Sequence, residues 1–114
     1  MTAVTNTSAL TTAAGIIQAR KHDTHPGIYF EDQVYTWQEY YQHAVRYAKI
    51  VDQLLVDKTP RHVGTLMENR PEYMFIWGAC ALTGSVQVSL NSTRRGSELA
   101  EDVYATDCQF ILYG

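Results

Sequence analysis

The 114-residue sequence is poor in several features that mark whole classes of protein. It has two cysteines, three prolines and a formal net charge of −3. Its longest apolar run, residues 75–82, is far shorter than the roughly 20 residues that a membrane-spanning helix needs. The low cysteine count argues against a disulfide-stabilised secreted scaffold, and the net negative charge gives no basic surface for nucleic acid. Cys80 and Cys108 are predicted to be buried thiols without a disulfide.

The start of the sequence has neither the basic residues nor the compact apolar core of a signal peptide. We therefore predict a cytoplasmic protein. Residues 1–7 are polar and are predicted to form a disordered tail, whereas residues 8–114 are predicted to form a single, incomplete α/β domain. A chain of this length buries about two thirds of the surface that it exposes when unfolded, which is enough for one hydrophobic core.

Motifs that carry catalysis or bind phosphates are also missing. The sequence has no Gly-x-x-x-x-Gly-Lys stretch, no nucleophile elbow and no His-Glu-x-x-His. A nucleotide-binding unit carries glycines between its strand and its helix, where this sequence has Glu68-Asn69-Arg70-Pro71. Pro71 removes one backbone donor there, and the carboxylate of Glu68 repels a phosphate. We therefore predict no catalytic, cofactor-binding or metal-binding residue.

What the sequence does contain is organised around residues 61–91. Strands are predicted at residues 62–67 and 85–90, because both segments are short and rich in β-forming residues. Between them, Pro71 suits the first turn of a helix and Gly84 suits its end. Strand, helix and strand with short connections predict a parallel βαβ unit.

The helix of this unit is apolar on nearly every side between Tyr73 and Leu82. Such a helix lies inside a protein rather than on its surface, so it must be covered on both sides. Its N-terminal cap is predicted to be Asn69 or Arg70, of which asparagine is the better capping residue.

The flanking segments predict the remaining elements. A first helix would bury a face made of Leu10, Ala14 and Ile17, and Pro26-Gly27 marks a turn before a β-hairpin. The predicted order is helix, hairpin, helix, strand, helix, strand, helix, strand. The flanking elements lie at residues 8–20, 28–36, 36–55, 97–106 and 109–113.

The helix after the hairpin carries the strongest local pattern. Thr36 and Glu39 have the spacing of a capping box, in which each side chain accepts a backbone N–H of the other residue. One helical face then carries Trp37, Tyr41, Ala44, Ala48, Val51 and Leu55. The predicted fold class is therefore α/β, with a small, mainly parallel sheet preceded by a hairpin and amphipathic helices.

Two histidines in the loop before the hairpin, His22 and His25, have a spacing that suits a metal site. No further ligand lies near them in the sequence. We interpret them as part of a solvated loop.

Arg94 and Arg95, just before the predicted helix at 97–106, are the anion-binding candidates. Planar guanidinium groups and a helix N-terminus both favour a phosphate or a carboxylate. The alternative is a solvated loop or an ion pair with Glu98 or Asp102. On the helix itself, Glu98, Glu101 and Asp102 are predicted to face solvent.

Several segments, in their order and spacing, resemble the start of the adenylate-forming acyl-CoA synthetases, which are also called AMP-binding enzymes. Asn91 with Arg94 and Gly96 leans towards the very-long-chain or fatty-acid-transport branch. The resemblance runs from about Leu10 to the end of the sequence. The matching segments are Tyr-Phe-Glu-Asp at 29–32, Tyr-Thr-Trp-Gln-Glu at 35–39, residues 62–72, residues 78–91 ending in Leu-Asn, and Ser-Glu-Leu-Ala at 97–100.

The resemblance implies a ligase that uses ATP and magnesium to join a fatty acid to AMP and then passes the acyl group to CoA. The family's phosphate loop, adenine-binding segment, acidic ribose-binding residue and lysine-bearing lid are all absent from this sequence. No catalytic residue is therefore carried over. We expect either the N-terminal scaffold of a longer ligase or a truncated product, inactive alone.

Two alternatives stay open: a stand-alone α/β binding or interaction module, and an enzyme that is active as it stands. As a scaffold, the chain would have the rest of the ligase or a second copy as its partner, through open sheet edges. Peripheral membrane contact is a further predicted interaction. We also expect exposed apolar surface around Phe75, Ile76 and Trp77.

Overall fold

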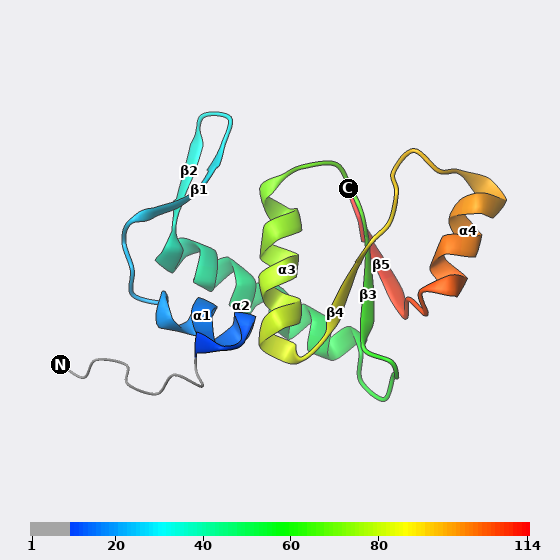
Figure 1. The fold of residues 1–114 in the computed structure, drawn as a ribbon, viewed down its shortest axis with the longest axis horizontal. Coiled ribbons are helices and arrows are strands. Elements are labelled where there is room, and N and C mark those ends of the chain that lie inside the picture. The colour runs from blue at the N-terminus through cyan, green and yellow to red at the C-terminus, as the bar shows by residue number, and fades with distance from the viewer. Residues whose placement is uncertain (1–9) are drawn as a thin grey trace.

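The structure is a computed structural model that describes residues 10–114, so the predicted tail at 1–7 lies outside the described residues. The helices and strands follow the predicted order (Figure 1). No helix within the described part of the chain is both long and apolar enough to cross a membrane. The elements are α1 (Ala13–Ala19), β1 (Pro26–Phe30), β2 (Gln33–Thr36), α2 (Trp37–Leu54), β3 (His62–Leu66), α3 (Pro71–Thr83), β4 (Val86–Ser89), α4 (Gly96–Ala105) and β5 (Phe110–Tyr113).

The described residues form two sheets. Strands β1 and β2 pair antiparallel as a hairpin, and β3, β4 and β5 form a parallel sheet in the order β4-β3-β5. Helices α3 and α4 lie on opposite sides of this three-stranded sheet (Figure 1). The predicted α/β fold, with its small parallel sheet and preceding hairpin, is confirmed.

Helix α2 begins with the predicted capping box. The Oγ1 atom of Thr36 accepts the backbone N–H of Glu39 at 3.1 Å, and the Glu39 carboxylate accepts the N–H of Thr36 at 2.8 Å. Further along, Tyr40 is buried, whereas the sequence placed Tyr41 on the buried face. The Tyr40 hydroxyl donates to the carbonyl oxygen of Met74 at 2.9 Å, which fastens α2 to α3.

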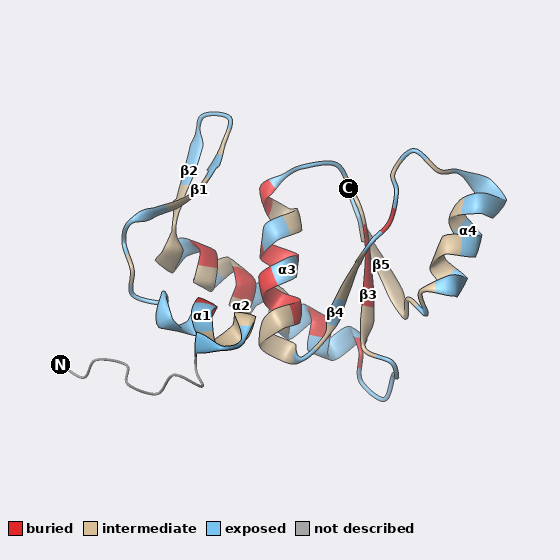
Figure 2. Cartoon of the chain, in the orientation of Figure 1, coloured by how far each residue is buried: buried red, intermediate tan, exposed pale blue. Residues whose placement is uncertain are grey.

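Helix α3 is covered on both sides, as predicted, by the parallel sheet and by α2. Buried residues concentrate on α3, on the part of α2 beside it and on β3 (Figure 2). Gly78 allows the two helices to approach closely, because a Cβ atom there would lie 2.5 Å from the Tyr40 hydroxyl oxygen. The main core cluster contains Val51, Leu55, Val63, Ile76, Ala79 and Cys80.

The exposed apolar side chains of α3 differ from those that the sequence predicted. Phe75 and Ile76 are 3% and 1% exposed, so the prediction was wrong for both, whereas Trp77 is 44% exposed and Met74 is 41% exposed. Met74 and Trp77 are three residues apart and therefore share one side of the helix. That side faces α1 and the start of α2, which cover it only in part.

The structure also corrects two predictions near the start of the chain. Helix α1 begins at Ala13 after the cap residue Thr12, so Leu10 precedes the helix and is exposed, while Ile17 is buried. Pro26, predicted to lie in a turn, is the first residue of β1. Proline is accepted there because the start of an edge strand needs no backbone donor.

Helix α4 has no buried residue. Cys80 is buried as predicted, but Cys108, which follows α4, is half-buried. Among the described residues, α4 is the only helix on this side of the sheet (Figure 1). Both cysteines are free thiols, so the prediction of no disulfide between them is confirmed. A hydrogen bond of 2.7 Å between His62 Nδ1 and the Thr106 carbonyl oxygen ties the end of α4 to the start of β3.

Candidate functional site

The direction in which successive strands are added to the three-stranded sheet reverses between β3 and β5. Strand β3 leads through α3 to its neighbour β4, and the chain then passes through α4 to reach the other side of β3. Adjacent strands whose connections lie on opposite faces leave a crevice outside their carboxyl ends, which is where open α/β sheets bind ligands. The topology thus places the expected site beyond Leu66 and Tyr113, the last residues of β3 and β5.

A cleft of about 720 Å³ occupies this position. Its volume is within the range of about 300–1,000 Å³ that is usual for small-molecule sites. The segment that joins β3 to α3 forms one wall, and the end of β5 forms another. Tyr113, at the end of β5, is 82% exposed. The lining consists of residues 66–72, Ser92, Arg95, Leu99, Tyr113 and Gly114, with Phe30 and Gln33 from the hairpin.

Arg70 is both a cleft residue and the N-cap of α3. Its side chain makes no capping hydrogen bond, and its Nε atom lies 3.4 Å from Oε2 of Glu72. Asn69, the better capping residue by type, does not take the cap position. Pro71 explains this, because a proline at the first helical position fixes the residue before it as the cap.

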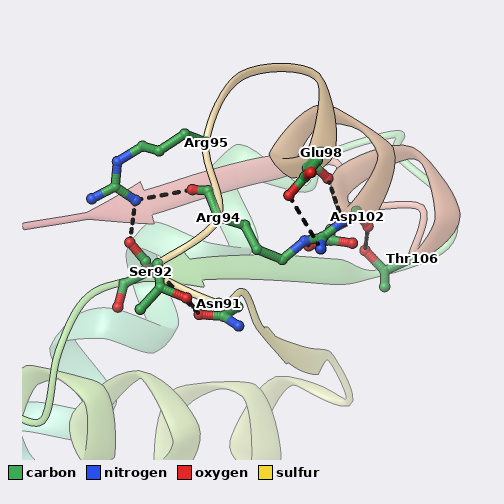
Figure 3. A network of polar contacts seen from close by, with 8 residues as sticks. Asn91, Ser92, Arg94, Arg95, Glu98, Asp102 and Thr106 are labelled. Atoms are coloured by element: carbon green, nitrogen blue, oxygen red, sulfur yellow. Dashed lines mark hydrogen bonds and ion pairs between the residues drawn. The ribbon is translucent and has the colours of Figure 1, made fainter.

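The structure separates the two arginines that were predicted together. Arg94 forms ion pairs with Asp102, at 2.6 Å, and with Glu98, at 3.5 Å (Figure 3). Asp102 is therefore half-buried and paired, and the prediction that it faces solvent was wrong. Asp102 lies two turns along α4 and therefore comes close to Arg94, which lies just before the helix. For Arg94, the alternative of an ion pair with Glu98 or Asp102 is thus the correct one.

Arg95 points away from this pair and lines the cleft (Figure 3). Its Nη1 atom donates to the carbonyl oxygens of Ser92 and of Arg94, the second at 2.9 Å. No carboxylate among residues 10–114 forms an ion pair with it. Of the two anion-binding candidates, only Arg95 keeps a guanidinium group for a ligand.

A set of polar side chains joins β4 to the first half of α3. Thr65 is buried, donates to the carbonyl oxygen of Val88 at 3.4 Å and accepts from Nε2 of Gln87 at 3.4 Å. Gln87 also donates to the carbonyl oxygen of Tyr73 at 3.2 Å, and the Tyr73 hydroxyl contacts Oγ of Ser89. These bonds give the buried hydroxyl group of Thr65 its partners, and they join β4 to the residues of α3 that follow Glu72.

The strongly perturbed side chains near the core lie outside the cleft. His43 stacks on the ring of Phe75 with centroids 4.3 Å apart, and burial lowers the pKa of His43. Burial also raises the pKa of Cys80 to about 11 and that of Tyr40 to about 12. Both groups stay protonated at neutral pH. None of these three groups lines the cleft.

The structure describes no further metal ligands around the two histidines of the first loop within residues 10–114. His25 Nδ1 lies 2.7 Å from the carboxylate of Asp23, which also pairs with Arg20. No group of three or more His, Cys, Asp or Glu side chains suited to a metal ion occurs among residues 10–114.

A second hollow, of about 380 Å³, lies between α1, the start of α2 and α3. We call it the apolar groove. Its walls are almost wholly apolar, and Ile16 and Trp77 at its rim are about half exposed. The groove has no charged side chain in its lining, which is Thr11, Thr12, Ala13, Ile16, Ile17, Trp37, Tyr40, Met74 and Trp77.

Sequence reasoning missed most of the cleft. Only Arg95 was a predicted candidate, whereas Phe30 and Tyr113 come from elements distant from it in the sequence. The one sequence signal that could have located the cleft was the parallel βαβ unit. Open α/β sheets bind ligands in a crevice outside the carboxyl ends of their strands. The strand order that fixes the position of the crevice is not encoded in any local pattern.

Comparison with known proteins identifies what this arrangement is similar to. The AMP-binding enzyme family matches residues 17–113. The medium/long-chain-fatty-acid–CoA ligase FadD17 of Mycobacterium tuberculosis is 40% identical over 88 residues, which are 77% of this chain and 18% of the relative. Steroid-22-oyl-CoA synthetase of Rhodococcus jostii is 37% identical over 102 residues, which are 90% of this chain and 18% of the relative. The chain thus spans about a fifth of the length of these curated relatives.

The solved structures agree on the fold. The N-terminal subdomain of Klebsiella oxytoca NpsA, in complex with anthranilyl-AMSN, superposes with a TM-score of 0.72 over 89% of this chain and 26% of that chain. The sequence identity is 21%, so this likeness shows the fold alone. The arrangement of hairpin, helices and parallel sheet therefore recurs within a larger subdomain.

Proposed function

This chain belongs to the AMP-binding enzyme family, and we propose that it is the N-terminal scaffold portion of a fatty-acyl-CoA synthetase. The observation that carries this proposal is the family match over residues 17–113 of a chain that spans only 18% of its FadD17 relative. The whole enzyme would activate a fatty acid with ATP, release pyrophosphate and transfer the acyl group to CoA. Activation is needed because a carboxylate is a poor electrophile, whereas an acyl adenylate is a good one.

In this proposal the chain is inactive alone. Its sequence lacks the family's Ser/Thr/Gly-rich phosphate loop. We therefore derive no step through ATP or magnesium on this chain. Its contribution is the parallel sheet, whose edge strands β4 and β5 have unpaired backbone groups on their outer sides. The rest of the ligase is the proposed partner of these edges; the cytoplasmic location and peripheral membrane contact stay predictions.

The test is a chimera. The matching segment of the M. tuberculosis ligase FadD17 is replaced by this chain, and ATP–pyrophosphate exchange is measured with a fatty acid. We expect exchange by the chimera and none by the 114-residue chain alone. A matched chimera with Ile76→Asp, which buries a charge in the core, is expected to lose exchange. Exchange by the chain alone, or a folded chimera without exchange, would contradict the proposal.

A stand-alone binding module is the second candidate function. The cleft at the carboxyl edge of the sheet favours it, because this cleft is formed by the chain's own residues. The two candidates differ in a measurable way. A scaffold needs no ligand of its own, whereas a binding module binds a ligand even when the rest of a ligase is absent.

A further inference from the structure

A serine outside the cleft follows the two arginines that were predicted as anion-binding candidates. The sequence reads Arg94-Arg95-Gly96-Ser97, and Ser97 is exposed on the first turn of α4. We propose that Ser97 is a phosphorylation site for a serine/threonine protein kinase with an acidic substrate groove, and that its phosphate group pairs with Arg95. This goes beyond the proposed scaffold function and does not depend on adenylation by the chain.

The two arginines give Ser97 the charge pattern that such a kinase selects. Kinases discriminate between substrates by the charges that flank the target hydroxyl group. Arginines two and three residues before a serine match carboxylates in the groove of the kinase, with which guanidinium groups form strong paired hydrogen bonds. No other serine or threonine in the sequence has arginines at both of these positions. The pattern therefore selects Ser97 alone.

Little holds the start of α4 in place, so that a kinase can reach Ser97. The hydroxyl group of Ser97 has no side-chain hydrogen bond with any of residues 10–114. The helix has no side-chain cap at its N-terminus and buries no residue. Segments with few buried contacts open locally at a low cost in free energy. The ion pairs of Arg94 with Glu98 and Asp102 are partly exposed, and such pairs are weak.

The modification is the transfer of one phosphoryl group from ATP to Ser97. The Oγ atom attacks the γ-phosphorus atom, the bond from that phosphorus to the oxygen that bridges to the β-phosphate breaks, and ADP leaves. The hydroxyl proton passes to the aspartate base of the kinase. The kinase supplies the catalysis and the magnesium, so no step needs a catalytic residue of this chain.

The product places about two negative charges near a guanidinium group whose donors are partly open. Nη1 of Arg95 is used by the carbonyl oxygens of Ser92 and Arg94 (Figure 3), whereas Nε and Nη2 donate to no residue within 10–114. A guanidinium group presents its donors in a fixed fork that matches two oxygens of a phosphate. Arg95 can therefore pair with the new phosphate without giving up its present hydrogen bonds.

Two carboxylates on α4 oppose this pairing. Glu98 follows Ser97 directly, and Glu101 lies one turn further along on the same side of the helix. The positive end of the helix dipole acts in the other direction, and Arg95 adds the nearest full positive charge that is not already paired. Because Arg95 also lines the cleft, a phosphate on Ser97 competes with the cleft for its guanidinium group.

The experiment treats the 114-residue chain with ATP, magnesium and the catalytic subunit of cAMP-dependent protein kinase, and it measures bound phosphate by intact mass and peptide mapping. We expect one phosphate group, on Ser97, and none when the kinase is left out. Ser97→Ala should stay unmodified. The matched control is Ser92→Ala in the preceding loop, where no arginine lies two or three residues earlier, and it should be modified at the wild-type rate.

Two arginine variants test the recognition. Arg95→Gln should lower the initial rate of modification by about tenfold or more, because a charge-assisted hydrogen bond to the kinase is lost. Arg46→Gln, which removes an exposed arginine on α2, should leave the rate within about twofold of the wild type. Thermal unfolding of each variant verifies that the fold is intact, which we expect because both arginines are exposed.

A synthetic peptide of residues 91–101 separates recognition from access. We expect the kinase to modify both the peptide and the folded chain at Ser97. Modification of the peptide alone would show that the folded chain hides Ser97, and it would overturn the proposal. So would the absence of modification in both, an unchanged rate in Arg95→Gln, or a phosphate found on another residue instead.

The pairing with Arg95 has its own readout, which is the phosphorus NMR signal of the modified chain followed as the pH is varied. A neighbouring guanidinium group favours the doubly charged phosphate and so lowers its second pKa. We expect this pKa to be higher in phosphorylated Arg95→Gln than in the phosphorylated wild type, and unchanged in Arg46→Gln. Equal values in all three would overturn the pairing.

None of these measurements depends on adenylation. Failure to modify Ser97 therefore leaves the scaffold proposal standing. A chimera without ATP–pyrophosphate exchange would contradict the scaffold proposal and would have no bearing on Ser97.

Discussion

Helices α3 and α4 are both crossover helices of one parallel sheet, yet they are held in opposite ways. Helix α3 buries Ile76, Ala79 and Cys80 between the sheet and α2, and it buries Phe75 in a second cluster with Ile17 and Tyr40. Helix α4 buries no residue, and its Tyr104 is 83% exposed. The same topological role is thus filled once by a helix with a buried face and once by a helix whose side chains are at most partly buried.

Polar contacts take the place of packing on the α4 side. Arg94 pairs with Asp102, the backbone of Thr106 accepts from His62, and the Thr106 hydroxyl donates to the carbonyl oxygen of Asp102 at 2.7 Å. Exposed ion pairs contribute little, whereas each large buried apolar side chain contributes about 1.5–3 kcal/mol. The stable part of the molecule is therefore the α2–α3 side, and the α4 side, which carries Arg95, is the part that a ligand or a partner can stabilise.

The largest expected effect is on the free energy of unfolding, when one side chain is truncated on each side of the sheet. Ile76→Ala removes a side chain that is 1% exposed and should lower the free energy of unfolding by about 2–5 kcal/mol. Leu99→Ala, which truncates a half-buried side chain of α4, should cost clearly less, on the order of 1 kcal/mol. Urea unfolding followed by circular dichroism measures both. Equal losses would show that α4 is packed as tightly as α3.

Gly78→Ala tests the α2–α3 contact by adding an atom to it instead of removing one. The added Cβ atom would lie 2.5 Å from the Tyr40 hydroxyl oxygen and 3.0 Å from Cβ of Ala44. We expect a loss of about 1–3 kcal/mol in the free energy of unfolding, although alanine is the better helix former. Tyr40→Phe removes the hydroxyl group that is contacted, so the double variant should lose less than the sum of the two single variants. An additive pair would contradict a clash at this contact.

The local parts of the fold could be predicted from the sequence, because each depends on neighbours in the chain. The capping box of Thr36 and Glu39, Pro71 at a helix start and Gly84 at a helix end all act within one turn. Predictions that depended on tertiary packing were less accurate. Phe75 was expected on the surface but is buried, because α2 packs over it through a contact that no local pattern specifies.

The cleft could be predicted only in part, for the same reason. Arg95 was a candidate because guanidinium groups bind anions, but Arg94 had the same sequence features and pairs with Asp102 two turns away. Tyr113 and Phe30 reach the cleft from β5 and from the hairpin, and their positions depend on the strand order β4-β3-β5. Strand order results from the whole chain, and a single sequence contains no direct record of it.

The ion pair on α4 tests the weaker side directly. Arg94→Gln and Asp102→Asn should each lower the free energy of unfolding by about 0.2–1 kcal/mol, because both side chains are about one third exposed and solvent screens the pair. A double-mutant cycle at low and high salt measures the coupling, which should shrink as salt rises. A coupling of several kcal/mol that is insensitive to salt would mean that polar contacts hold α4 as firmly as packing holds α3.

The smallest expected effect is a pH dependence on the α3 side. His43 stacks on Phe75 and meets the ring of Tyr35 edge-on, and burial lowers the pKa of His43, with Arg46 adding to the effect and with Glu39 and Glu72 opposing it. The unfolded chain then takes up a proton more readily than the folded chain. Stability from this group is therefore present above the ordinary value of 6.5 and is lost as the pH falls below it.

The variant that isolates this effect is His43→Phe, which keeps an aromatic ring on Phe75 but cannot titrate. Urea unfolding between pH 7.5 and 5 should show a smaller loss of stability for the variant than for the wild type, whereas Glu39, whose pKa is lowered by the capping hydrogen bonds from Thr36, acts at lower pH. Parallel pH profiles for the two proteins would show that the stacked ring is free to take up a proton in the folded state. In that case the contact between α2 and α3 around Phe75 would be looser than the burial of Phe75 indicates, and the contrast with α4 would rest on Ile76, Ala79 and Cys80 alone.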